Sequence, residues 1–268
     1  MSELKKVQID GYTIAYRKFG DKGAPLLLIA GLTADMSVWE PMIPELSKNH
    51  QVLIFDNLGV GYSQYPDVQV SLDEMASISN KLAESVFATP YHVVGHSMGG
   101  AIAQIVAKNH PSLLSLTIVC SFSKLSPLFT LVCKQKEKMY DQGLPPQFID
   151  ELALPWAFAP EYLEKEGVLE GIYKFQEENP CPQSKAGYKM QLNALLGFES
   201  IKWLVKIQAP TLIIGGEKDL IAPKEDSIQL TEGIPNARLE LLPNIGHVPQ
   251  FENPERLANL MSNFLSQA

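Results

Sequence analysis

The sequence predicts an α/β fold, in which a mostly parallel, doubly wound sheet is flanked by helices and covered by a helical insertion. Short β-rich runs alternate with amphipathic helical patterns along most of the 268 residues, which is the order expected of such a sheet. The runs at residues 26–29 and 212–214 are apolar throughout, as in parallel strands that helices cover on both faces. The alternation stops between residues 121 and 203, where the insertion is predicted.

Strands are predicted wherever a short run rich in β-branched and aliphatic residues lies between turn residues. A helix should begin at Ser71, because Ser71 and Glu74 have the spacing of a capping box. The last helix should begin at Asn253, a capping residue that is followed by Pro254 at the first helical position. The expected strands cover residues 12–18, 25–30, 51–55, 91–94, 114–119, 210–215 and 238–242.

Residues 121–203 differ in composition from the rest of the chain. They are rich in proline and in large apolar side chains, they are helix-prone, and they contain no convincing strand. Because this segment interrupts a regular sheet, we expect it to form a helical lid over the carboxyl ends of the strands. Residues 1–120 and 204–268 would then form the core domain.

The composition limits the partners and the location that we expect. The net charge is −8, so a nucleic acid or an anionic membrane surface would repel the chain. The first residues lack the apolar stretch of a signal peptide, and no apolar run approaches the length of a membrane span. The three cysteines are too scattered for a disulfide framework or a Cys-x-x-Cys metal site. We therefore expect a cytoplasmic protein that acts on a small molecule, and the sequence leaves its oligomeric state open.

The pentapeptide Gly95-His-Ser-Met-Gly99 lies between the predicted strand at residues 91–94 and a helical stretch at residues 100–108. A strand, Gly-x-Ser-x-Gly and a helix in this order are typical of a nucleophile elbow, a turn so tight that the serine hydroxyl stands clear of the chain. Side chains in place of the two glycines would collide with the neighbouring strand or helix. Ser97 is therefore the predicted nucleophile, and the alternative is a glycine-rich turn before an ordinary helix.

A serine nucleophile needs a base, and the base needs an acid that orients it. Of the five histidines, His247 lies in a loop after the last predicted strand, where it would face the elbow. Asp219 lies in the loop that follows the strand at residues 210–215, with Glu217 as a nearby competitor. Nucleophile, acid and base thus occur in this chain order, each after a strand. The alternative roles are a surface histidine and a turn-forming aspartate.

Attack by a serine on a carbonyl carbon also needs hydrogen-bond donors for the oxyanion of the tetrahedral intermediate. One donor is expected to be the backbone N–H of Met98, directly after the nucleophile. The other is expected to be the backbone N–H of Leu32, in the loop after the strand at residues 25–30. Because backbone donors do not depend on the side chain, this assignment rests on position in the chain.

Together these segments resemble α/β-hydrolase-fold enzymes of the lidded esterase, lactonase and peroxidase-like group. The resemblance implies a Ser-His-Asp triad and no cofactor. Two positions depart from the family pattern. Ala30 stands where many relatives have histidine, which concerns the anchoring of the oxyanion loop, and Leu58 stands where relatives commonly have arginine. The matching segments are residues 31–39, 56–63, 95–100, 210–219 and 246–254.

The absence of arginine from residues 121–203 bears on the substrate. Relatives that act on free carboxylates often hold them with arginine, whose guanidinium binds a carboxylate through two hydrogen bonds. A neutral ester of a small, largely apolar molecule is therefore favoured. Trp156, Phe158 and Leu195 are candidate wall residues of its pocket, and the alternative for each is packing between lid and sheet.

The predicted reaction is hydrolysis of a carboxylic ester through an acyl-enzyme on Ser97. Two alternatives keep the triad and change the bond: carbon–carbon hydrolysis, and a perhydrolase-type peroxidase reaction. A third alternative is a non-catalytic receptor that retains the pocket. Haloalkane dehalogenases and epoxide hydrolases are disfavoured, because these enzymes of similar fold need an aspartate where Ser97 stands.

Overall fold

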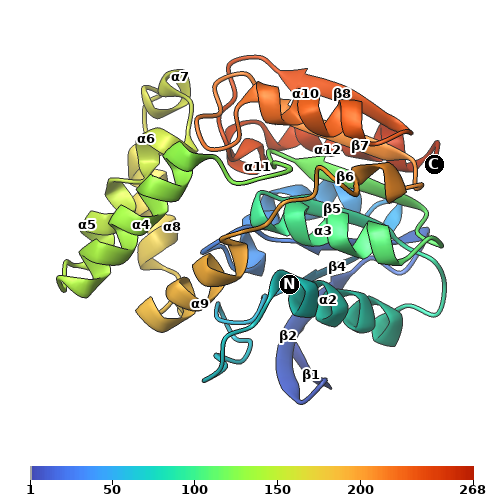
Figure 1. The fold of residues 1–268 in the computed structure, drawn as a ribbon, viewed down its shortest axis with the longest axis horizontal. Helices are drawn as coiled ribbons and strands as arrows, with labels where there is room; N and C mark the ends of the chain where they lie inside the picture. Colours follow the sequence, from blue (N-terminus) through green and yellow to red (C-terminus); the bar gives the residue numbers. More distant parts are fainter. Residues whose placement is uncertain (1) are drawn as a thin grey trace.

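The computed structural model describes residues 2–268, so residue 1, with which the predicted core domain begins, lies outside the described residues. The described strands form one sheet in the order β1-β2-β4-β3-β5-β6-β7-β8, and their bounds are β1 (Lys5–Ile9), β2 (Tyr12–Phe19), β3 (Ala24–Ile29), β4 (His50–Phe55), β5 (His92–His96), β6 (Ser115–Val119), β7 (Thr211–Gly216) and β8 (Ala237–Leu242). From β4 to β8 all neighbours pair in parallel, whereas β1 and β2 run antiparallel to their neighbours (Figure 1). The mostly parallel, doubly wound sheet is therefore confirmed.

All seven strands predicted from the sequence are present, with ends shifted by one or two residues. Strand β1 is additional and lies at the edge of the sheet. Of its residues only Ile9 is buried, because the strand pairs on one side alone, with β2. An exposed edge strand of this kind lacks the apolar pattern by which buried strands are recognised.

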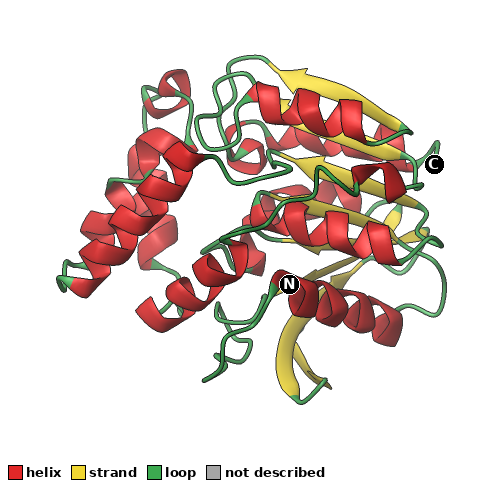
Figure 2. Ribbon diagram, in the orientation of Figure 1, coloured by secondary structure: helices red, strands yellow, loops and turns green. Residues whose placement is uncertain are grey.

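The helices lie on both sides of the sheet and beyond the ends of its strands (Figure 2). The bounds of the described helices outside the insertion are η1 (Met36–Met42), α1 (Ile43–Leu46), α2 (Leu72–Val86), α3 (Met98–Asn109), η2 (Leu204–Lys206), α10 (Lys224–Gly233), α11 (Pro249–Glu252) and α12 (Pro254–Leu265). Those of the insertion are α4 (Pro127–Asp141), α5 (Pro146–Glu151), α6 (Leu154–Ala157), α7 (Pro160–Leu163), α8 (Val168–Glu177) and α9 (Lys185–Leu195).

The apolar strands supply both faces of the core. In β3, Leu27 and Ile29 pack on the face that α2, α3 and α10 cover. Leu26 and Leu28 point the other way and pack against η1, α1 and α12. Successive side chains of a strand alternate between the two faces, so a central strand must be apolar at every position.

The predicted helix starts are confirmed by their caps. The Ser71 hydroxyl accepts the backbone N–H of Glu74 at 3.2 Å, and the Glu74 carboxylate accepts the N–H of Ser71 at 2.8 Å, which completes a capping box at the start of α2. The Asn253 side chain accepts the N–H of Arg256 at 3.2 Å, with Pro254 as the first residue of α12.

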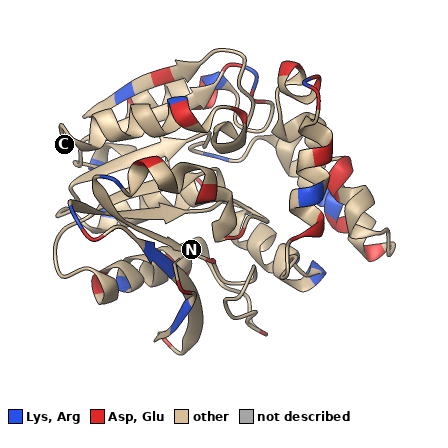
Figure 3. Cartoon of the chain, turned by 180° about the vertical axis from the view of Figure 1, so that it is seen from behind, with Lys and Arg blue, Asp and Glu red and all other residues tan. Residues whose placement is uncertain are grey.

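Residues 121–203 enter between β6 and β7 and carry α4 to α9, which lie to one side of the sheet in Figure 1. Figure 3 shows that acidic and basic residues both occur along these helices. Several form ion pairs between helices, including Lys136 with Asp150 at 3.0 Å and Lys185 with Asp141 at 2.7 Å. Helix α9 connects the insertion to the core, because Met190 and Leu195 belong to the main apolar cluster.

The helices described within residues 2–268 fall short of the length and apolar character that crossing a bilayer would require. Cys120, Cys133 and Cys181 form no disulfide with one another.

Candidate active site

Ser97 lies in the sharp turn between β5 and α3 with backbone angles φ 55° and ψ −121°, a strained conformation for a residue with a side chain. The turn depends on close backbone contacts at two glycines. A Cβ atom on Gly95 would overlap the carbonyl oxygen of Gly99, and one on Gly99 would overlap that of Ile29 in β3. This is the geometry that the pentapeptide predicts, with α3 pressed against the neighbouring strand.

A chain of hydrogen bonds links Ser97, His247 and Asp219, which lie on three separate loops. His247 Nε2 lies 2.8 Å from Ser97 Oγ, and His247 Nδ1 lies 2.8 Å from Asp219 Oδ2. All three residues are buried. The Asp219 carboxylate can only accept, so Nδ1 carries the imidazole proton and Nε2 is free to accept the proton of the serine hydroxyl.

The second oxygen of Asp219 is held in place by the chain that follows it. Asp219 Oδ1 accepts the backbone N–H of Ile221 at 2.8 Å and that of Ala222 at 2.9 Å. Glu217, the competitor in the sequence, is exposed to solvent. The structure thus brings Asp219 to His247 and leaves Glu217 outside this chain of hydrogen bonds.

A second histidine supports the first from within the elbow. His96 Nε2 donates to the backbone carbonyl of His247 at 2.7 Å, and the two rings lie 4.9 Å apart. Burial, reinforced by His247, lowers the pKa of His96 to about 3. His96 is therefore neutral near neutral pH and adds no positive charge beside His247.

The residues predicted to donate to the oxyanion are Met98, directly after Ser97, and Leu32, in the loop after β3. Met98 is the first residue of α3, so its N–H has no acceptor within the helix. The loop that carries Leu32 passes close to the nucleophile, because a Cβ atom on Gly31 would lie 3.0 Å from Ser97 Cβ.

Two amide side chains anchor the loop that carries Leu32. This loop begins at Ala30, where many relatives have histidine. Asn57 Nδ2 donates to the carbonyl of Ala30 at 3.2 Å. Gln191, fully buried on α9, accepts the N–H of Thr33 at 3.2 Å and donates to the carbonyl of Leu58 at 2.9 Å. Gln191 therefore joins the insertion to the oxyanion loop. Sequence reasoning missed it, because nothing in its helical neighbourhood indicates a partner 158 residues away.

The candidate pocket residues have different surroundings. Trp156 and Phe158 are half-buried and lie in and just after α6. The backbone of this segment reaches the site, since the N–H of His247 donates to the carbonyl of Ala157 at 2.9 Å. Leu195 is buried in the main apolar cluster, which is the packing role that the sequence analysis leaves open for it.

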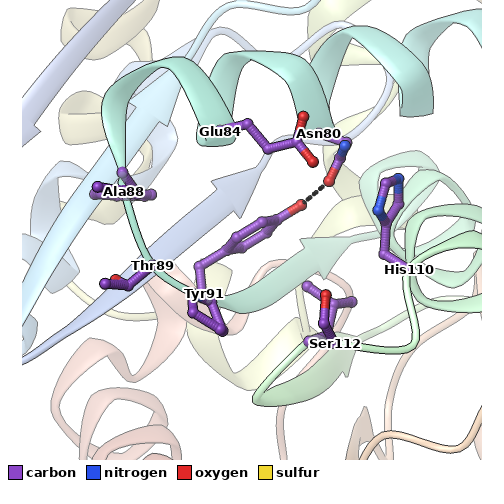
Figure 4. A pocket seen from close by; sticks show the side chains of 10 residues that line it. Asn80, Glu84, Ala88, Thr89, Tyr91, His110 and Ser112 are labelled. Carbon is purple, nitrogen blue, oxygen red and sulfur yellow. Dashed lines mark hydrogen bonds between the residues drawn. The ribbon is translucent and has the colours of Figure 1, made fainter.

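A surface hollow of about 380 Å³ lies at the opposite end of the sheet (Figure 4). Its lining includes Tyr91 and Leu113, which precede β5 and β6, whereas Ser97 follows β5. The Tyr91 hydroxyl donates to Asn80 Oδ1 at 2.6 Å, and His110 faces this pair across the hollow. Within residues 2–268, no group of three or more His, Cys, Asp or Glu side chains is arranged to hold a metal ion.

Known proteins resemble this chain along nearly its whole length. A family model described as alpha/beta hydrolase fold matches residues 24–254. A protein of Azorhizobium caulinodans with the provisional name carbamate hydrolase RutD is 28% identical over 84% of this chain and 84% of its own. The poly(3-hydroxyalkanoate) depolymerase of Ectopseudomonas oleovorans is 26% identical over 98% of this chain and 93% of its own. The structure of the enol-lactonase of Burkholderia xenovorans LB400 matches with a TM-score of 0.88 at 22% identity, over 98% of this chain and 100% of its own, which shows a shared fold.

Proposed function

Because the chain belongs to the alpha/beta hydrolase fold family, we propose that it is a serine hydrolase that cleaves a carboxylic ester through an acyl-enzyme. The observation that carries this proposal is the unbroken chain of 2.8 Å hydrogen bonds from Ser97 through His247 to Asp219. A hydroxyl, an imidazole and a carboxylate in this order constitute an activated nucleophile on any fold that presents them.

In the proposed reaction, Ser97 Oγ attacks the ester carbonyl while His247 Nε2 takes the hydroxyl proton. Asp219 holds the imidazole in the reactive tautomer and stabilises the imidazolium that forms. The backbone N–H groups of Leu32 and Met98 donate to the oxyanion of the tetrahedral intermediate. His247 then gives the proton to the departing alcohol, which leaves the acyl group on Ser97. Water activated by the same histidine releases the acid.

The inserted helices act, in this proposal, as a lid whose segment around Trp156 and Phe158 forms one wall of the substrate pocket. A neutral, largely apolar substrate is favoured because arginine is absent from residues 121–203. Two of the three arginines elsewhere have other contacts: Arg17 pairs with Glu40 at 2.8 Å, and Arg238 lies over the ring of Phe264.

We also propose a small-molecule substrate and a cytoplasmic location. The unpaired state of Cys120, Cys133 and Cys181 is compatible with a reducing compartment.

The test is a panel of p-nitrophenyl esters with acyl chains from C2 to C12, measured on the wild type and on Ser97→Ala. We expect the wild type to turn over at least one ester and the variant to lose about 10⁴-fold or more in kcat. A Ser97→Ala protein that kept wild-type turnover would refute the acyl-enzyme.

The same panel separates the alternatives when it is combined with labelling by a fluorophosphonate. Labelling of Ser97 without turnover of any ester would leave an activated serine that acts on a different bond. Assays with a carbamate, a dione and a peroxide would then identify that bond. Neither labelling nor turnover would favour a receptor that retains the hydrolase pocket.

A further inference from the structure

Glu252 is a buried carboxylate for which the proposed mechanism has no use. It ends the short helix α11, five residues after His247, and is 7% exposed. Its Oε1 accepts the backbone N–H of Gly246 at 2.9 Å, and its Oε2 lies 3.1 Å from the same nitrogen. Glu252 thus holds the residue that directly precedes His247.

The same carboxylate also holds the insertion. Glu252 Oε2 accepts the N–H of Ala159 at 3.2 Å, across 93 residues of sequence. Ala159 follows Phe158, and the carbonyl on the other side of Phe158, that of Ala157, accepts the N–H of His247 at 2.9 Å. The backbone is therefore tied to the His247 loop on both sides of Phe158, once directly and once through Glu252.

The two segments approach so closely that residue 246 must be glycine. A Cβ atom there would lie 2.7 Å from the nitrogen of Ala159 and 2.9 Å from the carbonyl carbon of Phe158. Neighbouring contacts reinforce the junction: the Tyr162 hydroxyl donates to the carbonyl of Phe251 at 3.1 Å.

Burial and the neighbouring groups affect the protonation state of Glu252. Burial raises the pKa of Glu252 above its ordinary value, and the N–H groups of Gly246 and Ala159 oppose that rise because they stabilise the carboxylate. The Asp219 carboxylate raises it further. Because burial of a charged group is costly unless hydrogen bonds compensate it, the contacts with Gly246 and Ala159 are what stabilise a carboxylate in this place.

We propose that Glu252 is a positioning residue that couples the inserted helices to the base, holding Phe158 and His247 at one separation through the N–H groups of Ala159 and Gly246. This inference rests on the proposed function. One carboxylate then both aligns His247 with Ser97 and sets the position of Phe158, the part of the pocket wall that would contact the acyl chain.

The test is Glu252→Gln, with Glu255→Gln on the exposed first turn of α12 as the matched control. Glutamine keeps the shape of glutamate, but whichever way its amide turns, its NH₂ group faces a backbone N–H. We expect the rate of Ser97 labelling by a small fluorophosphonate, per folded protein, to fall about ten-fold, as for the loss of one buried hydrogen bond. We expect the ratio of kcat/KM for the C8 ester to that for the C2 ester to change by a similar factor.

The control should match the wild type in both measurements, and Ser97→Ala belongs in the same series. If Ser97→Ala loses its labelling and turnover while Glu252→Gln keeps the wild-type labelling rate and C8 to C2 ratio, the coupling is refuted and the proposed function stands. If Ser97→Ala remains active, the proposed function itself fails.

Amide hydrogen exchange of the wild type gives a readout that does not depend on the variant folding. The N–H groups of Ala159 and Gly246 should be protected to the same degree, since one carboxylate holds both. Gly171, on the exposed part of α8, is the internal reference for an amide protected by its helix alone. Exchange of Ala159 as rapid as that of Gly171 would overturn the proposal.

Discussion

Replacing Asp219 with asparagine should disable His247 without unfolding the loop that carries residue 219. Asp219 Oδ1 accepts two backbone N–H groups, those of Ile221 and Ala222, whereas Oδ2 lies 2.8 Å from His247 Nδ1. The asparagine oxygen should therefore keep the two N–H groups, because the reverse orientation would place the NH₂ group against two donors. Its NH₂ group then faces His247 Nδ1.

An NH₂ donor at this position reverses the tautomer of the imidazole. Nδ1 must accept from the amide, so Nε2 carries the proton and cannot take the one on Ser97 Oγ, 2.8 Å away. In serine proteases the corresponding replacement lowers kcat by about 10⁴-fold. At about 1.36 kcal/mol for each factor of ten, this corresponds to about 5 kcal/mol in the activation free energy.

The stability of the variant should change much less than its activity. The bonds to Ile221 and Ala222 persist, so we expect a loss of about 1–2 kcal/mol in the free energy of unfolding. Asp219→Ala is the comparison, because it leaves both N–H groups buried without an acceptor and should cost more.

The assay combines kcat on the preferred p-nitrophenyl ester, the rate of fluorophosphonate labelling and urea denaturation for all three proteins. An Asp219→Asn variant with kcat within ten-fold of the wild type would refute the argument, since its base would then work without the carboxylate. Equal stability of the asparagine and alanine variants would refute the orientation assigned to the amide.

Two further predictions concern stability. Gly99→Ala should lower the free energy of unfolding, measured by urea denaturation, by about 3 kcal/mol and abolish labelling of Ser97, because the new Cβ overlaps the Ile29 carbonyl. The control is Gly171→Ala, in open space on α8, which should slightly raise the free energy of unfolding. Burial, and to a smaller extent His50, lower the pKa of His92 to about 4. The folded protein therefore protonates His92 only at a lower pH than the unfolded chain does. The free energy of unfolding should then fall as the pH drops from 6.5 to 4. His92→Gln should flatten this pH dependence, and an unchanged slope would contradict it.

The order of strands and helices was predictable from sequence because its signals are local. An apolar run marks a buried strand, and the Ser71 and Glu74 pair marks a helix start within four residues. The same holds for the elbow, since the glycines that permit the turn lie within two residues of Ser97. Strand β1 lacked such a signal because it is an exposed edge that depends on β2 for its pairing.

Tertiary structure decided which side chains meet. The sequence offered both Glu217 and Asp219 as partners of His247, and only the path of the chain after β7 turns Asp219 inward. The contacts that Gln191 makes with Thr33 and Glu252 makes with Ala159 had no local signature either, because these partners lie 158 and 93 residues away. Periodicity and turn chemistry are properties of neighbouring residues, whereas the alignment of a base with its nucleophile depends on how distant segments pack.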